Sequence, residues 1–112
     1  AAGITVPIIG FPRGAGTLYP KYARETGVTA LALDTAVQPE WARTALPDTL
    51  PVQGHLDPSV LRAGGAMLDG EVDRLLEAWA GRPHIFNLGH GITPDVPVAH
   101  VEQLLARIRR SA

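Results

Sequence analysis

The chain is organised around residues 84–95, which read His-Ile-Phe-Asn-Leu-Gly-His-Gly-Ile-Thr-Pro-Asp. Residues 85–88 form a short apolar run of strand length, and Gly89 and Gly91 flank His90 directly after it. Glycine allows a sharp turn and a close approach of a ligand, and histidine can hydrogen-bond, carry charge or move a proton near neutral pH. This stretch predicts a strand that ends in a functional loop.

The sequence before this stretch repeats the pattern of apolar strand, polar or glycine-rich loop and helix three times. Strands are predicted at residues 5–11, 30–33, 51–54 and 85–88. Helices are predicted at residues 18–26, in a short segment opened by Pro39, at residues 66–80 and at Val98–Arg110. The apolar spacing predicts that two helices each bury one side, with Leu68, Val72, Leu75, Leu76 and Trp79 on the first and Val98, Val101, Leu105 and Ile108 on the last.

Composition narrows the class of protein. Of the 112 residues, 46% are hydrophobic and 19% are charged, which is typical of one globular domain. A net charge of −1 argues against a nucleic-acid partner. The sequence has no long apolar run and no secretory-signal pattern, so we expect no membrane partner and a cytoplasmic location. The absence of cysteine agrees with that location and excludes disulfides and thiolate metal ligands.

Four βα units with no hairpin signal predict an α/β fold with parallel strands joined by right-handed crossovers. Such a sheet could be a small open sheet or half of a (β/α)8 barrel, since whole barrels take about 250 residues. In either fold, ligands bind at the carboxyl ends of the strands. The polar residues that the sequence places at these ends are Arg13, Asp34, His55, Asp57 and His90.

Each of these residues has a functional and a structural interpretation. His90 is predicted to donate a hydrogen bond to a substrate carboxylate, the alternative being a histidine that bonds and shapes its own loop. Arg13 either attracts an anion at a helix N-terminus or is a solvated loop residue. Asp34 is interpreted either as a residue of the cleft or as one that shapes its loop, and Asp57 as a helix cap before Pro58. A metal site built from His55, Asp57 and His90 is disfavoured, because adjacent strand ends do not by themselves show that side chains converge.

The remaining candidates have structural interpretations. His84 is predicted to precede its strand, and His100 to face solvent. Trp41 and Trp79 are predicted to be packing residues. Neither Ser59 nor Ser111 lies in a Gly-x-Ser-x-Gly elbow, so a serine nucleophile is not predicted.

Two motifs, Gln53-Gly54-His55-Leu56-Asp57-Pro58 and Phe86-Asn87-Leu88-Gly89-His90-Gly91, resemble the C-terminal portion of the uroporphyrinogen decarboxylase family. That family shows Leu-Gln-Gly-Asn-Leu-Asp-Pro and Phe-Asn-Leu-Gly-His-Gly at this separation. Residues 6–14 and 32–35 are similar to its Val-Pro-Val-Ile-x-Phe strand and its Gly-Leu-Asp-Trp segment. The resemblance covers residues 1–112 but only about the last third of a family member. His55 stands where the family has asparagine, and Thr35 where it has tryptophan.

The resemblance implies the C-terminal half of a (β/α)8 TIM barrel in a homodimeric enzyme without metal or organic cofactor. The family removes CO2 from the four acetate side chains of uroporphyrinogen III in heme biosynthesis, so the implied partner is a polycarboxylate tetrapyrrole. An aspartate and arginines from the N-terminal half do much of the family's chemistry, so we expect the isolated chain to be inactive. His90 maps onto the family's histidine, and Arg13 and His55 are further candidates for substrate binding.

Two alternatives stay open at this point. One is a related barrel methyltransferase that acts on corrinoid or thiol substrates, although such enzymes use zinc with a cysteine ligand. The other is a half-barrel module without catalytic activity. A half-barrel leaves sheet edges and one apolar face uncovered, so we expect the isolated chain to form a dimer or a larger assembly.

Overall fold

The fold is a parallel sheet of four short strands. The computed structural model describes residue 3 and residues 5–110. The strands are β1 (Ile9–Gly10), β2 (Ala30–Ala32), β3 (Val52–Gln53) and β4 (His84–Ile85). They lie in the order β1-β2-β3-β4, and each pair is parallel, with Ile9 opposite Ala30, Leu31 opposite Val52, and Val52 opposite His84. The predicted α/β fold with four parallel strands is confirmed.

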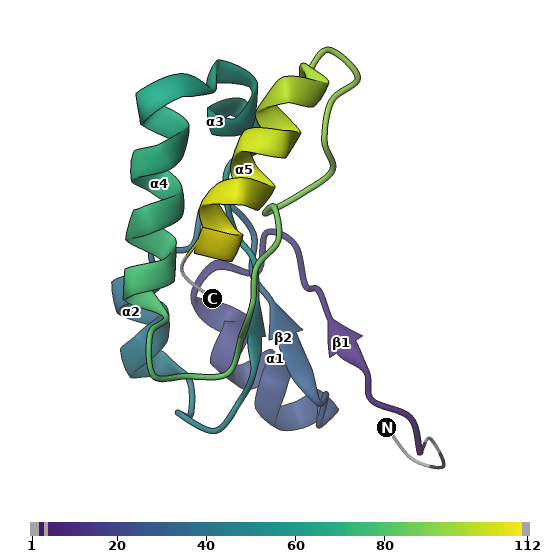
Figure 1. Ribbon diagram of the computed structural model, residues 1–112. Helices are drawn as coiled ribbons and strands as arrows, with labels where there is room; N and C mark the ends of the chain where they lie inside the picture. The colour runs from purple at the N-terminus through teal and green to yellow at the C-terminus, as the bar shows by residue number, and fades with distance from the viewer. Residues whose placement is uncertain (1–2, 4, 111–112) are drawn as a thin grey trace.

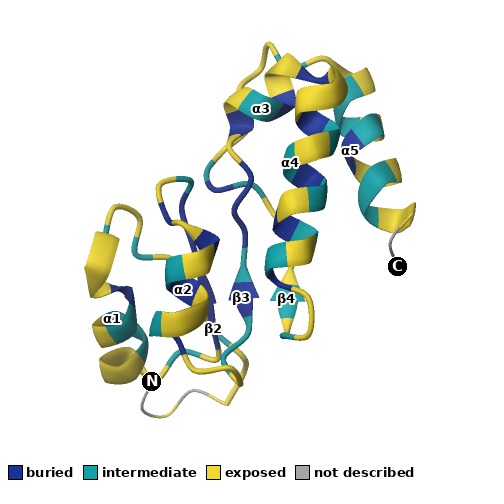
Figure 2. Cartoon of the chain, turned by 90° about the vertical axis from the view of Figure 1, so that its left-hand side faces the viewer, coloured by how far each residue is buried: buried dark blue, intermediate teal, exposed yellow. Residues whose placement is uncertain are grey.

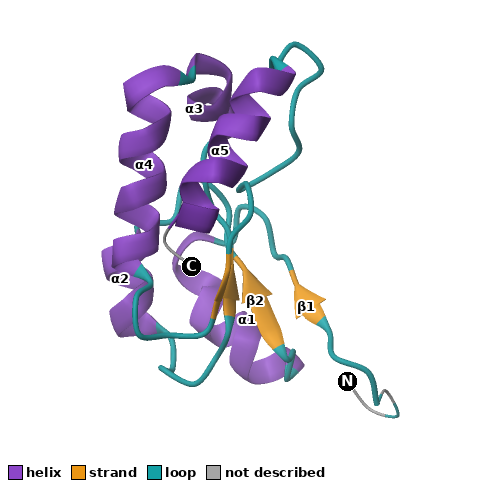
Figure 3. Ribbon diagram, viewed as in Figure 1, coloured by secondary structure: helices purple, strands orange, loops and turns teal. Residues whose placement is uncertain are grey.

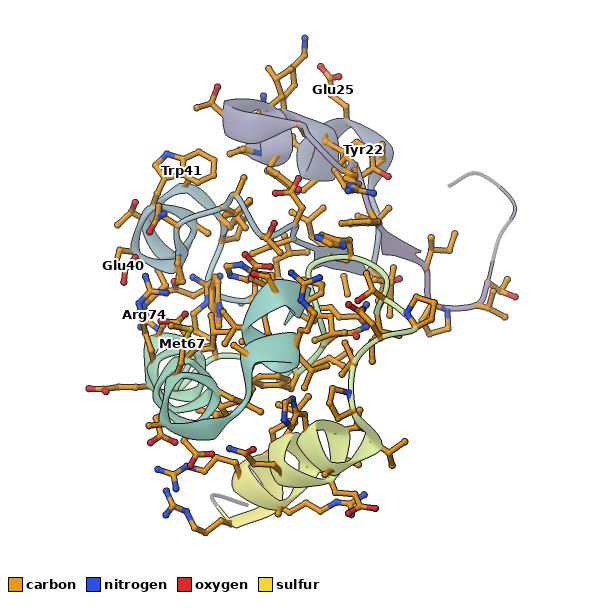
Figure 4. All side chains as sticks on the ribbon, turned by 90° about the horizontal axis from the view of Figure 1, so that it is seen from above. Tyr22, Glu25, Glu40, Trp41, Met67 and Arg74 are labelled. Atoms are coloured by element: carbon orange, nitrogen blue, oxygen red, sulfur yellow. The ribbon has the colours of Figure 1, made fainter. Side chains whose placement is uncertain are left out.

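The helices gather along one side of this sheet (Figures 1 and 4). They are the 3-10 helix η1 (Gly16–Leu18) and the α-helices α1 (Tyr19–Thr26), α2 (Pro39–Ala45), α3 (Pro58–Ala63), α4 (Gly65–Ala78) and α5 (Val98–Arg110). Within the described part of the chain no helix covers the other face of the sheet, where Ile9, Phe11 and Ile85 are each more than 40% exposed. The sheet is therefore open on one face and at both edges.

The apolar core lies between the sheet and the helices, where Figure 2 shows buried residues on the inner sides of β2, β3 and α4. One cluster joins Leu31, Leu33 and Val52 of the sheet to Tyr19 and Trp79. A second cluster lies under α3, α4 and α5 and contains Leu56, Leu61, Leu68, Val72, Leu75 and Leu104. Leu68, Val72, Leu75 and Trp79 are all nearly inaccessible, which confirms the predicted buried side of this helix.

Two arginines join the C-terminal ends of α2 and α4. Arg82 donates to the carbonyl oxygen of Arg43 (3.0 Å) in the last turn of α2 and to that of Pro47 (2.6 Å) just after the helix. Arg43 in turn donates to the carbonyl oxygen of Ala78 at the end of α4 and to that of Ala80 just after it. The last carbonyls of a helix have no partner within it, so the bonds to Arg43 and Ala78 satisfy groups that would otherwise need water. Farther along, Glu40 and Arg74 form a 3.4 Å ion pair between the same helices (Figure 4).

The strands are shorter than predicted, and loops make up much of the sheet's carboxyl end (Figure 3). The first strand is limited to Ile9–Gly10, because Pro7 and Pro12 have no N–H for the ladder. The last strand is His84–Ile85 rather than 85–88, so His84 lies within β4 and not before it. After Ile85 the chain leaves the ladder and returns at Leu88, which forms an isolated bridge with Leu56.

The buried side of the last helix agrees only in part with the one predicted. Val101 and Ile108 pack against the second cluster as predicted, and Leu104 is buried, whereas Val98 is 73% exposed and Leu105 is also exposed. The side of α5 that faces α3 and α4 also makes polar contacts. His100 contacts the carbonyl oxygen of Leu61 through Nδ1 (2.9 Å), and Arg107 forms two hydrogen bonds with Asp73 (2.9 and 2.5 Å). The prediction that His100 faces solvent is wrong, because its ring fills the space beside Gly64.

Candidate functional site

A hollow of about 400 Å³ lies on the open face of the sheet at its carboxyl end. Its walls come from all four βα units and include Ile9, Phe11, Ala32, Leu33, Gln53, Asn87, Leu88, Gly89, His90 and Gly91. The side nearest β1 is apolar. The opposite side is the loop after β4, which contributes backbone and polar side chains. Such a combination of an apolar wall and a few polar groups is typical of a site for a small organic ligand.

His90 lies in the wall of this hollow and is half-buried. Its Nδ1 atom lies 3.3 Å from the carbonyl oxygen of Gly91. When Nδ1 donates its proton to this carbonyl, Nε2 remains available, with a lone pair in the neutral ring and a proton in the charged ring. The protonated form can donate a charge-assisted hydrogen bond to a carboxylate.

The backbone around His90 is fixed by close contacts. The N–H of Gly89 donates to the carbonyl oxygen of Leu56 (2.8 Å). A Cβ atom on Gly89 would lie 2.4 Å from Cγ2 of Thr35 and 2.6 Å from its backbone nitrogen. Residue 89 therefore has to be glycine for this loop to pack against the end of β2, and the position of His90 follows from that packing.

Asp57 occupies the neighbouring strand end. Its Oδ1 accepts the N–H (2.8 Å) and the hydroxyl (2.8 Å) of Ser59, which confirms the predicted cap of the following helix. The Ser59 N–H is the largest influence on this carboxyl and lowers its pKa; the nearby charge of His90 acts in the same direction. Asp57 thus places a carboxylate at the strand end next to the loop of His90.

Arg13 is exposed, in the loop between β1 and η1, and it is not part of the wall of the hollow. It follows Phe11, which lines the hollow, by two residues. No ion pair or hydrogen bond of the Arg13 side chain is found among residues 5–110, so its guanidinium is available to an anion at the rim. The structure places Arg13 and His90 at the same end of the sheet, on the loops that follow the two edge strands.

His55 points away from the hollow. Its ring packs edge-on against Trp79, with the ring centroids 6.2 Å apart, and the residue is only 5% exposed. Burial, together with the charges of His84 and Arg74, lowers the pKa of His55 to about 4, so the ring is neutral at pH 7. The expectation that residue 55 faces the cleft is therefore wrong, and a charged contact of His55 with a substrate carboxylate has no support in this geometry.

His84 also lies behind the sheet. Its ring stacks on Trp79 with the centroids 6.0 Å apart, and its Nε2 contacts the carbonyl oxygen of Gly54 (2.7 Å). Trp79 is fully buried in this stack, which confirms that it is a packing residue. No three His, Asp or Glu side chains of the described residues come together as a set that could hold a metal ion. His55, Asp57 and His90 thus do not form the disfavoured metal site.

Two polar residues of the hollow have no role in the predictions from sequence. Gln53 alternates with the buried Val52 and faces the open side of β3. Asn87 uses Oδ1 to accept the N–H of Leu88 (2.8 Å), which leaves its amide N–H2 group for a ligand. The period-two alternation of Val52 and Gln53 was the signal that could have identified Gln53.

The structure is a parallel α/β unit with a hollow at the carboxyl ends of its strands. The sequence profile described as "Uroporphyrinogen decarboxylase (URO-D)" matches residues 1–111. The chain therefore belongs to the uroporphyrinogen decarboxylase family, whose fold is a TIM barrel, and the open sheet is a fragment of such a barrel.

Curated relatives agree with this assignment. A uroporphyrinogen decarboxylase of Maricaulis maris is 84% identical over 97% of this chain and 32% of its own length. Proteins of the same name from Hyphomonas neptunium and Sphingopyxis alaskensis are 62% and 63% identical, over 97% and 92% of this chain. The chain spans about a third of the length of these relatives.

None of the helices in the described residues has the length and apolar character needed to cross a membrane.

Proposed function

We propose that this chain is the C-terminal part of a uroporphyrinogen decarboxylase, which converts uroporphyrinogen III to coproporphyrinogen III by removing four CO2 molecules. The observation that carries the proposal is the placement of His90 in the wall of the hollow, beside an apolar surface formed by Ile9 and Phe11. A tetrapyrrole has apolar ring surfaces and carboxylate side chains, so it suits a hollow with one apolar side and one polar side that can donate hydrogen bonds.

The chemistry requires a place for the electrons of the breaking C–C bond. Protonation of a pyrrole ring at carbon provides it: the bond between the acetate methylene and its carboxylate breaks, CO2 leaves, and the electron pair enters the ring cation. A proton then adds at the methylene carbon, which becomes a methyl group. In this scheme His90 and Arg13 hold substrate carboxylates, and the groups that transfer protons belong to the remainder of the enzyme.

The proposal includes the assembly and location of the whole enzyme. Since the chain spans about a third of the length of its relatives, the remaining strands of a longer protein would cover the open face and pair with the edges of β1 and β4. We propose a cytoplasmic homodimer that binds a polycarboxylate tetrapyrrole, without a nucleic-acid or membrane partner.

The test is expression of the longest reading frame that encodes this chain, followed by an anaerobic assay with uroporphyrinogen III. Chromatography of the oxidised products should show the seven-, six- and five-carboxylate intermediates and then the four-carboxylate product. A reading frame long enough for a whole barrel that yields no decarboxylated product would contradict the proposal. A frame of barely more than these residues would favour the alternative of a self-associating module.

A further inference from the structure

Asp34 is a buried carboxylate at the end of β2 that holds two separate loops. Its Oδ2 accepts the N–H of Gly14 from the loop after β1 (2.6 Å). Its Oδ1 accepts the N–H of Ala36 from its own turn (3.0 Å). The residue is only 6% exposed, and its backbone N–H donates to the hydroxyl of Tyr19 at the start of α1 (3.2 Å).

These contacts place the loop that carries Arg13. Gly14 follows Arg13 directly, so the hydrogen bond from the Gly14 N–H to Asp34 fixes the peptide unit that joins Arg13 to Gly14. The other backbone hydrogen bonds found for residues 12–16 are local: Ala15 N–H donates to Pro12 O (3.0 Å), and Leu18 N–H donates to Ala15 O (3.0 Å). Of the contacts that join this loop to the sheet, the one made by Asp34 thus lies nearest to Arg13.

From this geometry we propose that Asp34 is a positioning residue for substrate binding, which acts by holding Arg13 at the rim of the hollow. The inference rests on the proposed function, because it assigns the carboxylates of the tetrapyrrole as the anions that Arg13 meets. Asp34 itself lies outside the wall of the hollow and does not contact the ligand.

An ionised carboxylate suits this position better than any neutral side chain. Burial works against the charge, but the N–H groups of Gly14 and Ala36 and the Tyr19 hydroxyl outweigh it, so the pKa of Asp34 lies below its ordinary value. Both oxygens accept an N–H. Asparagine has one acceptor oxygen, and its N–H2 group would face the second donor. An Asp34→Asn variant can therefore keep only one of the two hydrogen bonds. It keeps either the local turn to Ala36 or the bond to Gly14, and it loses the other.

The same turn touches the loop of His90. Gly89 packs against the backbone of residues 34 and 35, since a Cβ atom there would lie 3.1 Å from the carbonyl carbon of Asp34. The turn at the end of β2 therefore lies between the loop of Arg13 and the loop of His90. A change at Asp34 is transmitted to Arg13 by the lost bond, whereas Gly89 keeps its own bond to Leu56.

The experiment uses the full-length enzyme with Asp34→Asn, Arg13→Ala and the double variant. We expect Asp34→Asn to raise KM for uroporphyrinogen about tenfold while kcat stays within about twofold, because a displaced binding group weakens ground-state and transition-state binding alike. In the Arg13→Ala background the same change should raise KM by less than about twofold, since the residue it positions is gone. Asp48→Asn is the matched control, because Asp48 is an exposed carboxylate beside Arg82.

A second measurement separates this inference from the proposed function. Amide hydrogen exchange of the peptide that spans residues 11–18 should become faster in Asp34→Asn and stay unchanged in Asp48→Asn. Three results would each overturn the positioning role. The first is that the effects of Asp34→Asn and Arg13→Ala on KM multiply in the double variant. The others are a loss in kcat at unchanged KM and unaltered hydrogen exchange at Gly14. If the wild-type enzyme forms no product, the proposed function fails on its own, and the exchange still decides whether Asp34 holds the loop.

Discussion

Gly89 lies against Thr35 so closely that a single methyl group does not fit between them. The ideal Cβ position on Gly89 is 2.4 Å from Cγ2 of Thr35 and 2.6 Å from its backbone nitrogen. Because one of these atoms belongs to the backbone, a smaller side chain at residue 35 does not relieve the contact. Gly91, on the other side of His90, has nothing within 4 Å of its Cβ position.

Gly89→Ala should therefore displace the loop of His90, and Gly91→Ala should not. We expect Gly89→Ala to lower the free energy of unfolding by about 1–3 kcal/mol, which is typical of an overpacked site. Gly91→Ala adds the same methyl group to open space and should change the free energy of unfolding by less than about 1 kcal/mol. Chemical denaturation of both variants checks this pair, and equal losses would contradict the close approach.

His90→Ala in the full-length enzyme should lower kcat/KM for uroporphyrinogen by roughly tenfold or more, about 1.4 kcal/mol. The physical reason is the loss of a charge-assisted hydrogen bond to a substrate carboxylate. Steady-state kinetics measure the change. Arg109→Ala is the control, since Arg109 is exposed on α5 and is not part of the wall of the hollow. Unchanged kinetics in His90→Ala would remove His90 from the site.

The buried His55 should make the protein less stable in mild acid. The unfolded chain binds a proton at the ordinary histidine pKa of 6.5, whereas burial and the charges of His84 and Arg74 lower the folded value to about 4. Between these values the unfolded state binds more protons, so stability is lost as pH falls from about 6.5 to about 4. The loss from this residue is about 3 kcal/mol. His55→Asn should flatten this part of a plot of unfolding free energy against pH, and an unaltered slope would contradict the assignment.

Arg82→Ala should destabilise the junction of α2 and α4. The guanidinium bonds two carbonyl oxygens and lies 5.4 Å from the centre of the Trp79 ring. We expect a loss of about 2–4 kcal/mol in the free energy of unfolding, and Arg82→Lys should recover only part of it, because an ammonium lacks the planar fork. Asp48→Ala should cost less than about 0.5 kcal/mol, since that carboxylate is 90% exposed and 3.7 Å from Arg82. Thermal or chemical unfolding distinguishes the three variants.

The isolated 112 residues should associate and should not decarboxylate. Ile9, Phe11 and Ile85 on the open face, and the unpaired edges of β1 and β4, favour contact with a second chain. Light scattering at micromolar concentration should show a dimer or a larger species, and Phe11→Ser should reduce its amount. A clean monomer, or substantial product formation by the isolated chain, would contradict this prediction.

The parallel pairing of the strands and the rim were predictable because they depend on local patterns. Four apolar runs separated by helices leave little choice but parallel pairing. Asp57 before Pro58 predicts a cap from its own neighbours, and the cap is found. His90 between two glycines predicts an accessible loop, and the loop lines the hollow.

Features that depend on distant residues were not predictable. Alternation from Val52 places residue 55 on the open face, but the backbone of Gly54, with φ +124°, breaks the alternation and turns His55 toward Trp79. The bond from Gly14 to Asp34 joins residues twenty positions apart. In α5 the apolar spacing predicted Val98 and Leu105 as buried, whereas hydrogen bonds to α3 and α4 decide which side faces the protein.

Each strand of the sheet pairs only with its neighbours in sequence, and this order has a consequence for protein engineering. Further βα units can be joined at either edge without separating any pair that already exists. A barrel of this kind can therefore be divided between two genes at the loop that precedes β1. Co-expressed halves would then meet along their strand edges and restore the closed ring without a covalent link.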